Sequence, residues 1–322
     1  MTTFAVSFSA FGHAGPWVQI LTDAGIFALL AIGLQINVGY TGIVNFGQVG
    51  FAALGGYVTG ILILKAHFAF IPACLVAIVF TMLVGVLIGI PSLRLRADYF
   101  AIATIASAEI IRYIAQNARG LTGGNEGLTA FNGGWLSASN TILGWFRSAG
   151  WQNPDSGAPL LAVLLVALLI VTVGLWAVQR TPWGRVLRAV REDEDAARAL
   201  GKNTLSYKLQ SLALSAGVAA IGGIFLALEL AFLTPDAYRP QVTFIAYACL
   251  ILGGLANYWG VAIGATIMWI ILDGVQDIDL SISADKLAAL RFVFVGVLLI
   301  LLMAFRPQGI FGKRQEMVLE EQ

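Results

Sequence analysis

The stretch AGIFALLAIGLQINVGYTGIVNFGQVGFAALGGYVTGILIL, residues 24–64, decides the fold because it contains no Asp, Glu, Lys or Arg. A helix needs about 20 apolar residues to cross the hydrocarbon core of a bilayer, so this run is long enough for two crossings. Comparable runs without these four residue types recur along the chain, at 66–93, 159–179, 209–228 and 240–272. The expected fold class is therefore all-α, a polytopic helical bundle in a membrane.

The composition of the whole chain supports the same fold class. Of its 322 residues 58% are hydrophobic and 11% are charged, and the mean hydropathy is +0.83. Soluble domains carry about 25% charged residues. We expect about eight to ten membrane-spanning helices, with spans near 17–36, 42–64, 68–90, 98–117, 159–179, 206–231, 240–256, 258–275 and 287–305. The glycine-rich region 39–60 is the best candidate for a broken helix, which is tolerated at membrane depth only around a cavity or inside protein.

The distribution of basic residues predicts the orientation of these spans. Twelve of the 19 Lys and Arg residues fall near 94–96, 180–208 and 306–314. An even number of expected crossings separates these segments, so all three lie on one side, which the positive-inside rule makes cytoplasmic. We therefore expect one transmembrane domain over 1–322, with a periplasmic loop region at 118–158, a cytoplasmic segment at 180–204 and a cytoplasmic tail at 306–322. Nine spans place the N-terminus outside, whereas a further crossing within 39–60 places it inside.

The stretch RAVREDEDAARALGKN, residues 188–203, concentrates eight charged side chains in sixteen positions of an otherwise apolar chain. Thr181 as a cap, Pro182 at the first helical position and Gly201 just past the end predict one amphipathic helix over 182–200. Three pairs of opposite charge lie four residues apart, namely Arg188–Glu192, Arg191–Asp195 and Glu194–Arg198. The residues alone allow an ordinary surface helix, a helix in the lipid interface or a docking element.

Five quoted stretches carry a resemblance to a known family. Asp195-Ala196-Ala197-x-x-x-Gly201 resembles the EAA…G coupling loop of ABC-importer permeases, with Asp in place of Glu. The longer matches are TPWGRVLRAVREDEDAARALG (181–201), PSLRLRADYFAIATIASAEIIR (91–112), GYTGIVNFGQVGFAALGGY (39–57), TGGNEGL (122–128) and FRPQGIFG (305–312). In their order along the chain, these stretches resemble the LivM-type permease subunits of branched-chain amino acid ABC transporters, the LivH/LivM family. The similarity covers nearly the full length and is weakest at about 131–156.

The resemblance implies a transmembrane permease that forms half of the path of an ATP-driven importer for branched-chain or related aliphatic amino acids, in the bacterial inner membrane. It implies a homologous LivH-type permease, two ATPase subunits of the LivG/LivF type that bind the ATP, and a periplasmic substrate-binding protein as partners. The residues implied to couple to an ATPase are Arg191, Glu194, Asp195, Ala196, Ala197 and Gly201. Two alternatives stay open, a permease for urea or short-chain amides and a stand-alone secondary transporter or channel.

Polar side chains inside the expected spans are the candidates for a solute path, because such groups are costly in a bilayer. Asn37, Asn45 and Gln48 lie in or beside the glycine-rich region, and Glu109 lies one turn from Arg112. We expect the first three and Glu109 to line a path for a zwitterionic solute. The alternatives are interhelical hydrogen bonds for the amides and a helix-end ion pair for Glu109.

The sequence contains no set of residues that indicates an enzyme. No nucleophile–base set and no cluster of metal-ligating residues is apparent, and the Gly-Lys-Ser/Thr end of a phosphate-binding loop is absent. No basic patch with interleaved aromatic residues indicates a nucleic-acid partner. We expect neither catalysis, nor a metal, nor a cofactor in this chain.

Overall fold

The computed structural model describes residues 14–150 and 154–276, together with 293, 296–297, 300–301 and 309–311. Within these residues the chain is helical apart from turns, short extended segments and one antiparallel bridge between Leu128 and Leu233. The all-α prediction is confirmed. Nearly all of the expected span 287–305 and of the tail 306–322 lies outside the described residues.

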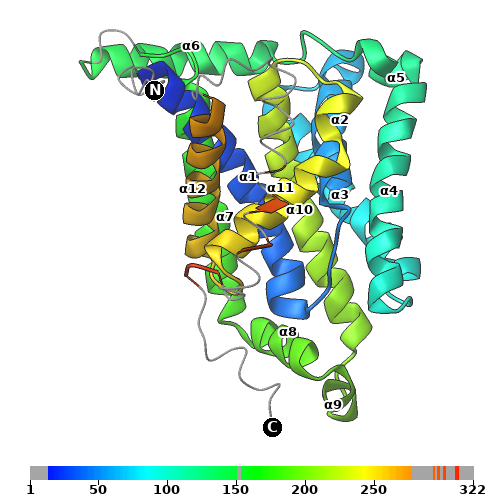
Figure 1. Ribbon diagram of the computed structural model, residues 1–322. Coiled ribbons are helices and arrows are strands. Elements are labelled where there is room, and N and C mark those ends of the chain that lie inside the picture. The colour runs from blue at the N-terminus through cyan, green and yellow to red at the C-terminus, as the bar shows by residue number, and fades with distance from the viewer. Residues whose placement is uncertain are drawn as a thin grey trace, which may run out of the picture.

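Long helices that run roughly side by side make up the bundle (Figure 1). They are α1 (Ala14–Thr41), α2 (Gln48–Ala66), α3 (Phe70–Ser92), α4 (Ala97–Asn117), α7 (Ala158–Gln179) and α10 (Thr204–Leu230). All except α4 are long and apolar enough to cross a membrane. Helices α1 and α10 are mostly buried and form the centre, whereas α3 and α7 expose most of their apolar side chains. This exposure is expected of helices whose outer face contacts lipid.

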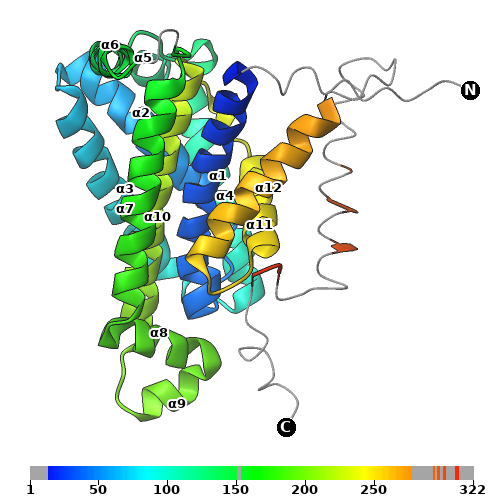
Figure 2. The same ribbon diagram turned by 90° about the vertical axis from the view of Figure 1, so that its left-hand side faces the viewer.

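Short helices close the two ends of the bundle (Figures 1 and 2). Helix α6 (Gly133–Ser148) lies across one end, where α5 (Arg119–Thr122) and η2 (Gly124–Glu126) lie next to α4, and α8 (Pro182–Glu192) and α9 (Glu194–Ala199) lie at the opposite end. The expected loop region 118–158 therefore contains a 16-residue helix that the sequence analysis did not anticipate.

The basic segments 94–96 and 180–208 lie at the same end of the bundle, as the orientation prediction requires. Helix α1 begins at the other end of the bundle, the end at which α6 lies. Residues 39–60 contain no additional crossing, because α1 continues to Thr41 and α2 starts at Gln48. The break expected within 39–60 is a non-helical segment at 42–47, in which Ile43, Asn45 and Gly47 are buried.

The expectation of two separate crossings at 240–256 and 258–275 is wrong. After η3 (Pro235–Tyr238), helices α11 (Pro240–Gly253) and α12 (Tyr258–Gln276) are bent by 117° at residues 254–257. Helix α11 has 14 residues, or about 21 Å, which is shorter than a hydrocarbon core of about 30 Å. The bend begins at Gly254, whose φ of +100° is a conformation that residues with a side chain rarely adopt.

Helix α10 crosses α2 at close range because both helices carry glycine at the contact. A Cβ atom on Gly223 would overlap the backbone of Ala52, and one on Gly55 would overlap the backbone of Ala220. Small residues are common at such crossings in membranes, because lipid gives helices little hydrophobic drive to associate and close packing takes its place. This crossing sets α10 against α2 at the level where α2 begins.

Candidate functional site

The non-helical segment 42–47 runs back from the α8 end of the bundle into its interior, where α2 begins (Figure 1). A helix start leaves backbone N–H groups without intrahelical partners, and in a membrane they need other acceptors. Side chains from two other helices supply these acceptors. The Val49 N–H donates to Thr243 Oγ1 of α11 at 3.1 Å, and the Phe46 N–H donates to Thr104 Oγ1 of α4 at 3.1 Å.

Asn45 stabilises this segment from within. Its Oδ1 accepts from the Gly47 N–H at 2.9 Å, and its Nδ2 donates to Gln48 Oε1 at 3.2 Å. The backbone carbonyl of Asn45 accepts from the Tyr247 hydroxyl at 2.9 Å. The segment is thus tied to α2 and to α11, and its path through the interior is defined by side-chain hydrogen bonds.

A second group of hydrogen bonds joins Gln48 to α1 and α10. Asn37 Nδ2 donates to Ser215 Oγ at 2.9 Å, and Ser215 Oγ donates to Gln48 Oε1 at 3.1 Å. Ser211 Oγ donates to Asn37 Oδ1 at 3.1 Å. Together with Asn45 these residues form what we call the buried amide network, all of them with 0% exposure. The structure thus brings three of the four expected path residues together.

Glu109 is not part of this network. Its carboxylate accepts three hydrogen bonds from Arg112, of which the shortest, from Nη2 to Oε2, measures 2.6 Å. Arg112 also lies 4.0 Å from Asp236 of η3, near the α6 end of the bundle. Ser211 and Ser215 are network members that the sequence analysis missed. Their spacing of four residues places both serines on one face of the helix and could have indicated a polar contact there. Serine is common in membrane helices, however, so this spacing alone did not single them out.

The charged segment at the opposite end is two helices, so the prediction of a single helix over 182–200 is wrong. The chain bends at Asp193, whose carboxylate accepts from the Asp195 and Ala196 N–H groups at 2.9 Å each and so caps α9. Asp is among the preferred capping residues, which explains the break. Pro182 and Gly201 lie where expected, and Gly201 has φ +77°.

Thr181 occupies the capping position of α8, but its hydroxyl donates backwards to the Val178 carbonyl at 2.6 Å.

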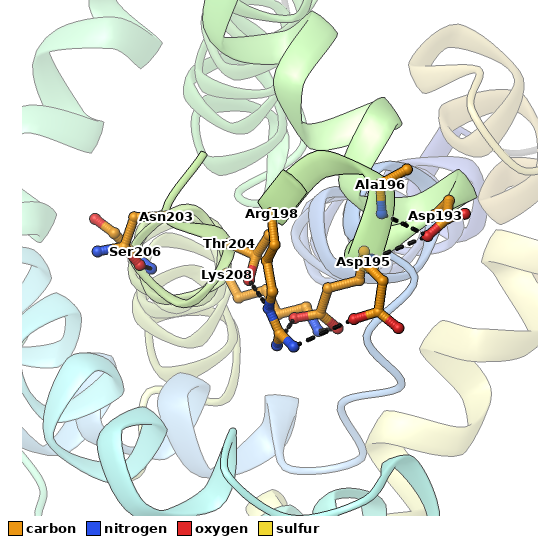
Figure 3. Close-up of polar contacts among 9 residues, drawn as sticks. Asp193, Asp195, Ala196, Arg198, Asn203, Thr204, Ser206 and Lys208 are labelled. Carbon is orange, nitrogen blue, oxygen red and sulfur yellow. Dashed lines mark hydrogen bonds and ion pairs between the residues drawn. The ribbon is translucent and has the colours of Figure 1, made fainter. Parts of the chain in front are cut away.

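Ion pairs join α9 to the start of α10 (Figure 3). Arg198 donates to Glu194 at 2.6 Å and to Thr204 Oγ1 at 3.0 Å, and Lys208 also pairs with Glu194. Partial burial opposes ionisation of Glu194, but the bonds and charges of Lys208 and Arg198 outweigh it and hold the pKa of Glu194 below its usual value. The Glu194–Arg198 pair was predicted, whereas the pairing with Lys208 depends on the bend at Asp193.

Arg191 points into the protein. Its Nη1 donates to the Gly39 carbonyl at 2.6 Å, in the last turn of α1, and its side chain packs beside Gly42. The expected Arg191–Asp195 pair does not form, because the bend at Asp193 removes the helical spacing between them. Arg191 therefore joins the charged segment to the beginning of 42–47.

The outer face of the charged segment differs from the one expected. Ala197 is buried against its own chain, whereas Asp195, Ala196 and Gly201 are exposed, and Leu200 is 80% exposed. A leucine this exposed at the tip of a charged helix is an additional candidate for contact with a partner.

In the part of the chain that the structure describes, no group of three or more His, Cys, Asp or Glu side chains could hold a metal ion.

Comparison with known proteins shows the family. Residues 17–303 match the family model described as branched-chain amino acid transport system / permease component. The chain is 30% identical to the high-affinity branched-chain amino acid transport system permease protein LivM of Escherichia coli (strain K12), over 91% of this chain and 69% of that protein. It is 26% identical to the probable LivM permease of Methanocaldococcus jannaschii, over 92% and 93% of the two chains.

The LivH permease of the same Escherichia coli strain is 25% identical, over 91% of this chain and 93% of its own. No solved structure matches the chain. With its apolar bundle and these relatives, the chain is a multi-pass membrane protein and belongs to the family of branched-chain amino acid transport system permease components.

Proposed function

We propose that the chain is one permease of an ATP-driven ABC importer for branched-chain or related aliphatic amino acids in the bacterial inner membrane. It forms half of the translocation path and works with a LivH-type permease, two ATPase subunits that bind ATP, and a periplasmic binding protein. The observation that carries this proposal is the Arg191–Gly39 bond, because it joins the charged segment to the last turn of α1, directly before the non-helical segment 42–47 that leads to the buried amide network.

The charged segment 182–201 is the proposed coupling element. Asp195, Ala196 and Gly201, with Leu200, form its exposed face and contact the ATPase. The buried Ala197 holds α9 against the rest of the chain, and the ion pair of Glu194 with Lys208 joins α9 to α10. Arg191 then transmits a displacement of α8 to residues 39–47.

The proposed solute path runs beside the start of α2, along Asn37, Asn45 and Gln48, and passes Glu109 toward the α6 end. The N-terminal end of a helix attracts anionic groups, and broken helices in transporters use this to hold a substrate carboxylate. The amide network is closed within the single chain. Its opening is therefore the step that ATPase movement drives.

Reconstitution tests the proposal. The chain is inserted into liposomes with a LivH-type permease, the two ATPases and the binding protein, and uptake of labelled leucine is measured with and without ATP. ATP-dependent uptake is expected. Uptake without the ATPases indicates a stand-alone transporter or channel, and uptake of urea in place of leucine indicates an amide permease. Alanine at Asn45 or Gln48 lowers uptake while the complex still assembles. The control, alanine at the exposed Asn117, leaves both uptake and assembly unchanged.

A further inference from the structure

A cavity of about 280 Å³ opens at the α8 end of the bundle, away from the buried amide network. It lies between the end of α7, the start of α8 and the α11–α12 bend, which approach one another there (Figure 1). Its polar and aromatic lining residues include Trp176, Gln179, Arg180, Arg188, Asn257 and Trp259. Among the described residues the two arginines are the only charged ones in the lining, which gives this part of the cavity a positive charge.

Both guanidinium groups are held in place by neighbouring groups on the same stretch of chain. Arg180 stacks over the Trp176 ring, with 3.6 Å from Cζ to the ring centre. Arg188 Nη2 donates to the Gln179 carbonyl at 3.2 Å. Among the described residues neither arginine forms an ion pair with a carboxylate. A guanidinium group can donate two parallel bonds to a phosphate, so two arginines in one cavity suit a phosphate as ligand.

The surface that leads from the cavity toward the middle of the bundle is apolar. Leu169, Ile170 and Val173 of α7 are exposed, as are Trp259 and Ile263 of α12. Tryptophan is enriched at membrane–water boundaries, which places the cavity at the level of lipid headgroups. Basic pockets between helices on the cytoplasmic side suit anionic headgroups. The acyl chains of a lipid would cover this apolar surface, whereas a free anion would not contact it.

We propose that the cavity binds the phosphate headgroup of an anionic phospholipid from the leaflet on the α8 side, with its acyl chains along α7 and α12. Arg180 and Arg188 hold the phosphate, and Trp176 and Trp259 flank it. This lipid lies against α8 and the α11–α12 bend, so it stabilises the position of α8 at this end of the bundle.

Native mass spectrometry of the full chain, extracted from its membrane in mild detergent, tests the proposal. The wild type retains phosphatidylglycerol or cardiolipin, and the double variant Arg180→Gln/Arg188→Gln retains about tenfold less, since each basic residue near an anionic surface contributes severalfold in affinity. The matched control Arg94→Gln/Arg96→Gln removes the same charge from the same end of the bundle and retains lipid like the wild type.

A titration of the delipidated protein separates the sources of phosphate. Phosphatidylglycerol raises the midpoint of thermal unfolding, and neither phosphatidylcholine nor inorganic phosphate does so. The variant Arg180→Lys/Arg188→Lys keeps both charges and retains an intermediate amount of lipid, which covers the case that the glutamine variant does not fold. The proposal is overturned if the glutamine variant retains as much lipid as the wild type, or if inorganic phosphate stabilises the protein as much as phosphatidylglycerol does. It is also overturned if the glutamine variant loses copurifying ATPase while its bound lipid is unchanged.

Discussion

Replacement of Arg191 by alanine tests whether the charged segment acts on the centre of the bundle. The substitution removes the bond from Nη1 to the Gly39 carbonyl and the packing of the side chain beside Gly42. Nothing else in α8 reaches this carbonyl, since Arg188 bonds to Gln179 and Arg185 bonds to Arg180. The end of α1 then loses its hydrogen bond to the coupling element, while the fold of α8 and its packing against α1 are retained.

The magnitude follows from the kind of bond that is lost. A hydrogen bond from a charged donor stabilises a protein by about 1.5–3 kcal/mol. The charged segment is either bound to the end of α1 through Arg191 or detached from it. Loss of the bond therefore shifts this equilibrium toward the detached state by about tenfold to hundredfold. This is a large change for one contact but small against the stability of the bundle, so Arg191→Ala still inserts and assembles. Lysine restores the charge but not the geometry of the guanidinium, so Arg191→Lys gives an intermediate loss.

Two measurements check this prediction. In the reconstituted importer, Arg191→Ala keeps basal ATP hydrolysis but loses its stimulation by loaded binding protein, and hydrogen exchange of residues 42–47 becomes faster. The matched control is Arg185→Ala, which removes an exposed arginine from the same helix and leaves both readouts unchanged. If Arg191→Ala keeps full stimulation and unchanged exchange, or if Arg185→Ala has the same effect, the link from α8 to the centre does not exist.

Three further predictions address packing, charge and orientation. Gly223→Ala lowers the thermal unfolding midpoint in detergent because the added methyl group overlaps the backbone of α2, whereas Gly174→Ala, which points into open space, does not. Because the folded-state pKa of Glu194 is lowered, its contribution is present above the ordinary carboxyl pKa and is lost as the pH falls through the lowered value. Hydrogen exchange of α9 therefore rises at acidic pH, and in Glu194→Gln it is fast at every pH. Cysteine at exposed Ser137 reacts with an impermeant thiol reagent in intact cells, and cysteine at Leu200 is protected, while the reverse pattern would invert the orientation.

The amino-acid sequence by itself determined where most of the long helices lie and which segment concentrates charge. The charge-free run 24–64 predicted α1, α2 and the break between them, and the segment 188–203 predicted the charged end. These features are local, because they depend on hydropathy over one helix length and on the positions of Pro and Gly. The family motifs within these stretches added the class of transport protein.

Only the tertiary structure decided which distant groups meet. Asn37 and Ser215, or Arg191 and Gly39, are far apart in the sequence, and no local pattern specifies their pairing. The bend of α11 against α12 was missed because the run 240–272 is apolar throughout, and hydropathy does not distinguish one long crossing from two short helices. Likewise the sequence identifies Arg180 and Arg188 only as cytoplasmic charges. The α11–α12 bend brings Trp259 into the same cavity as these two arginines. Hydropathy selects an environment for each segment, whereas the fit of side chains between packed helices selects its partners.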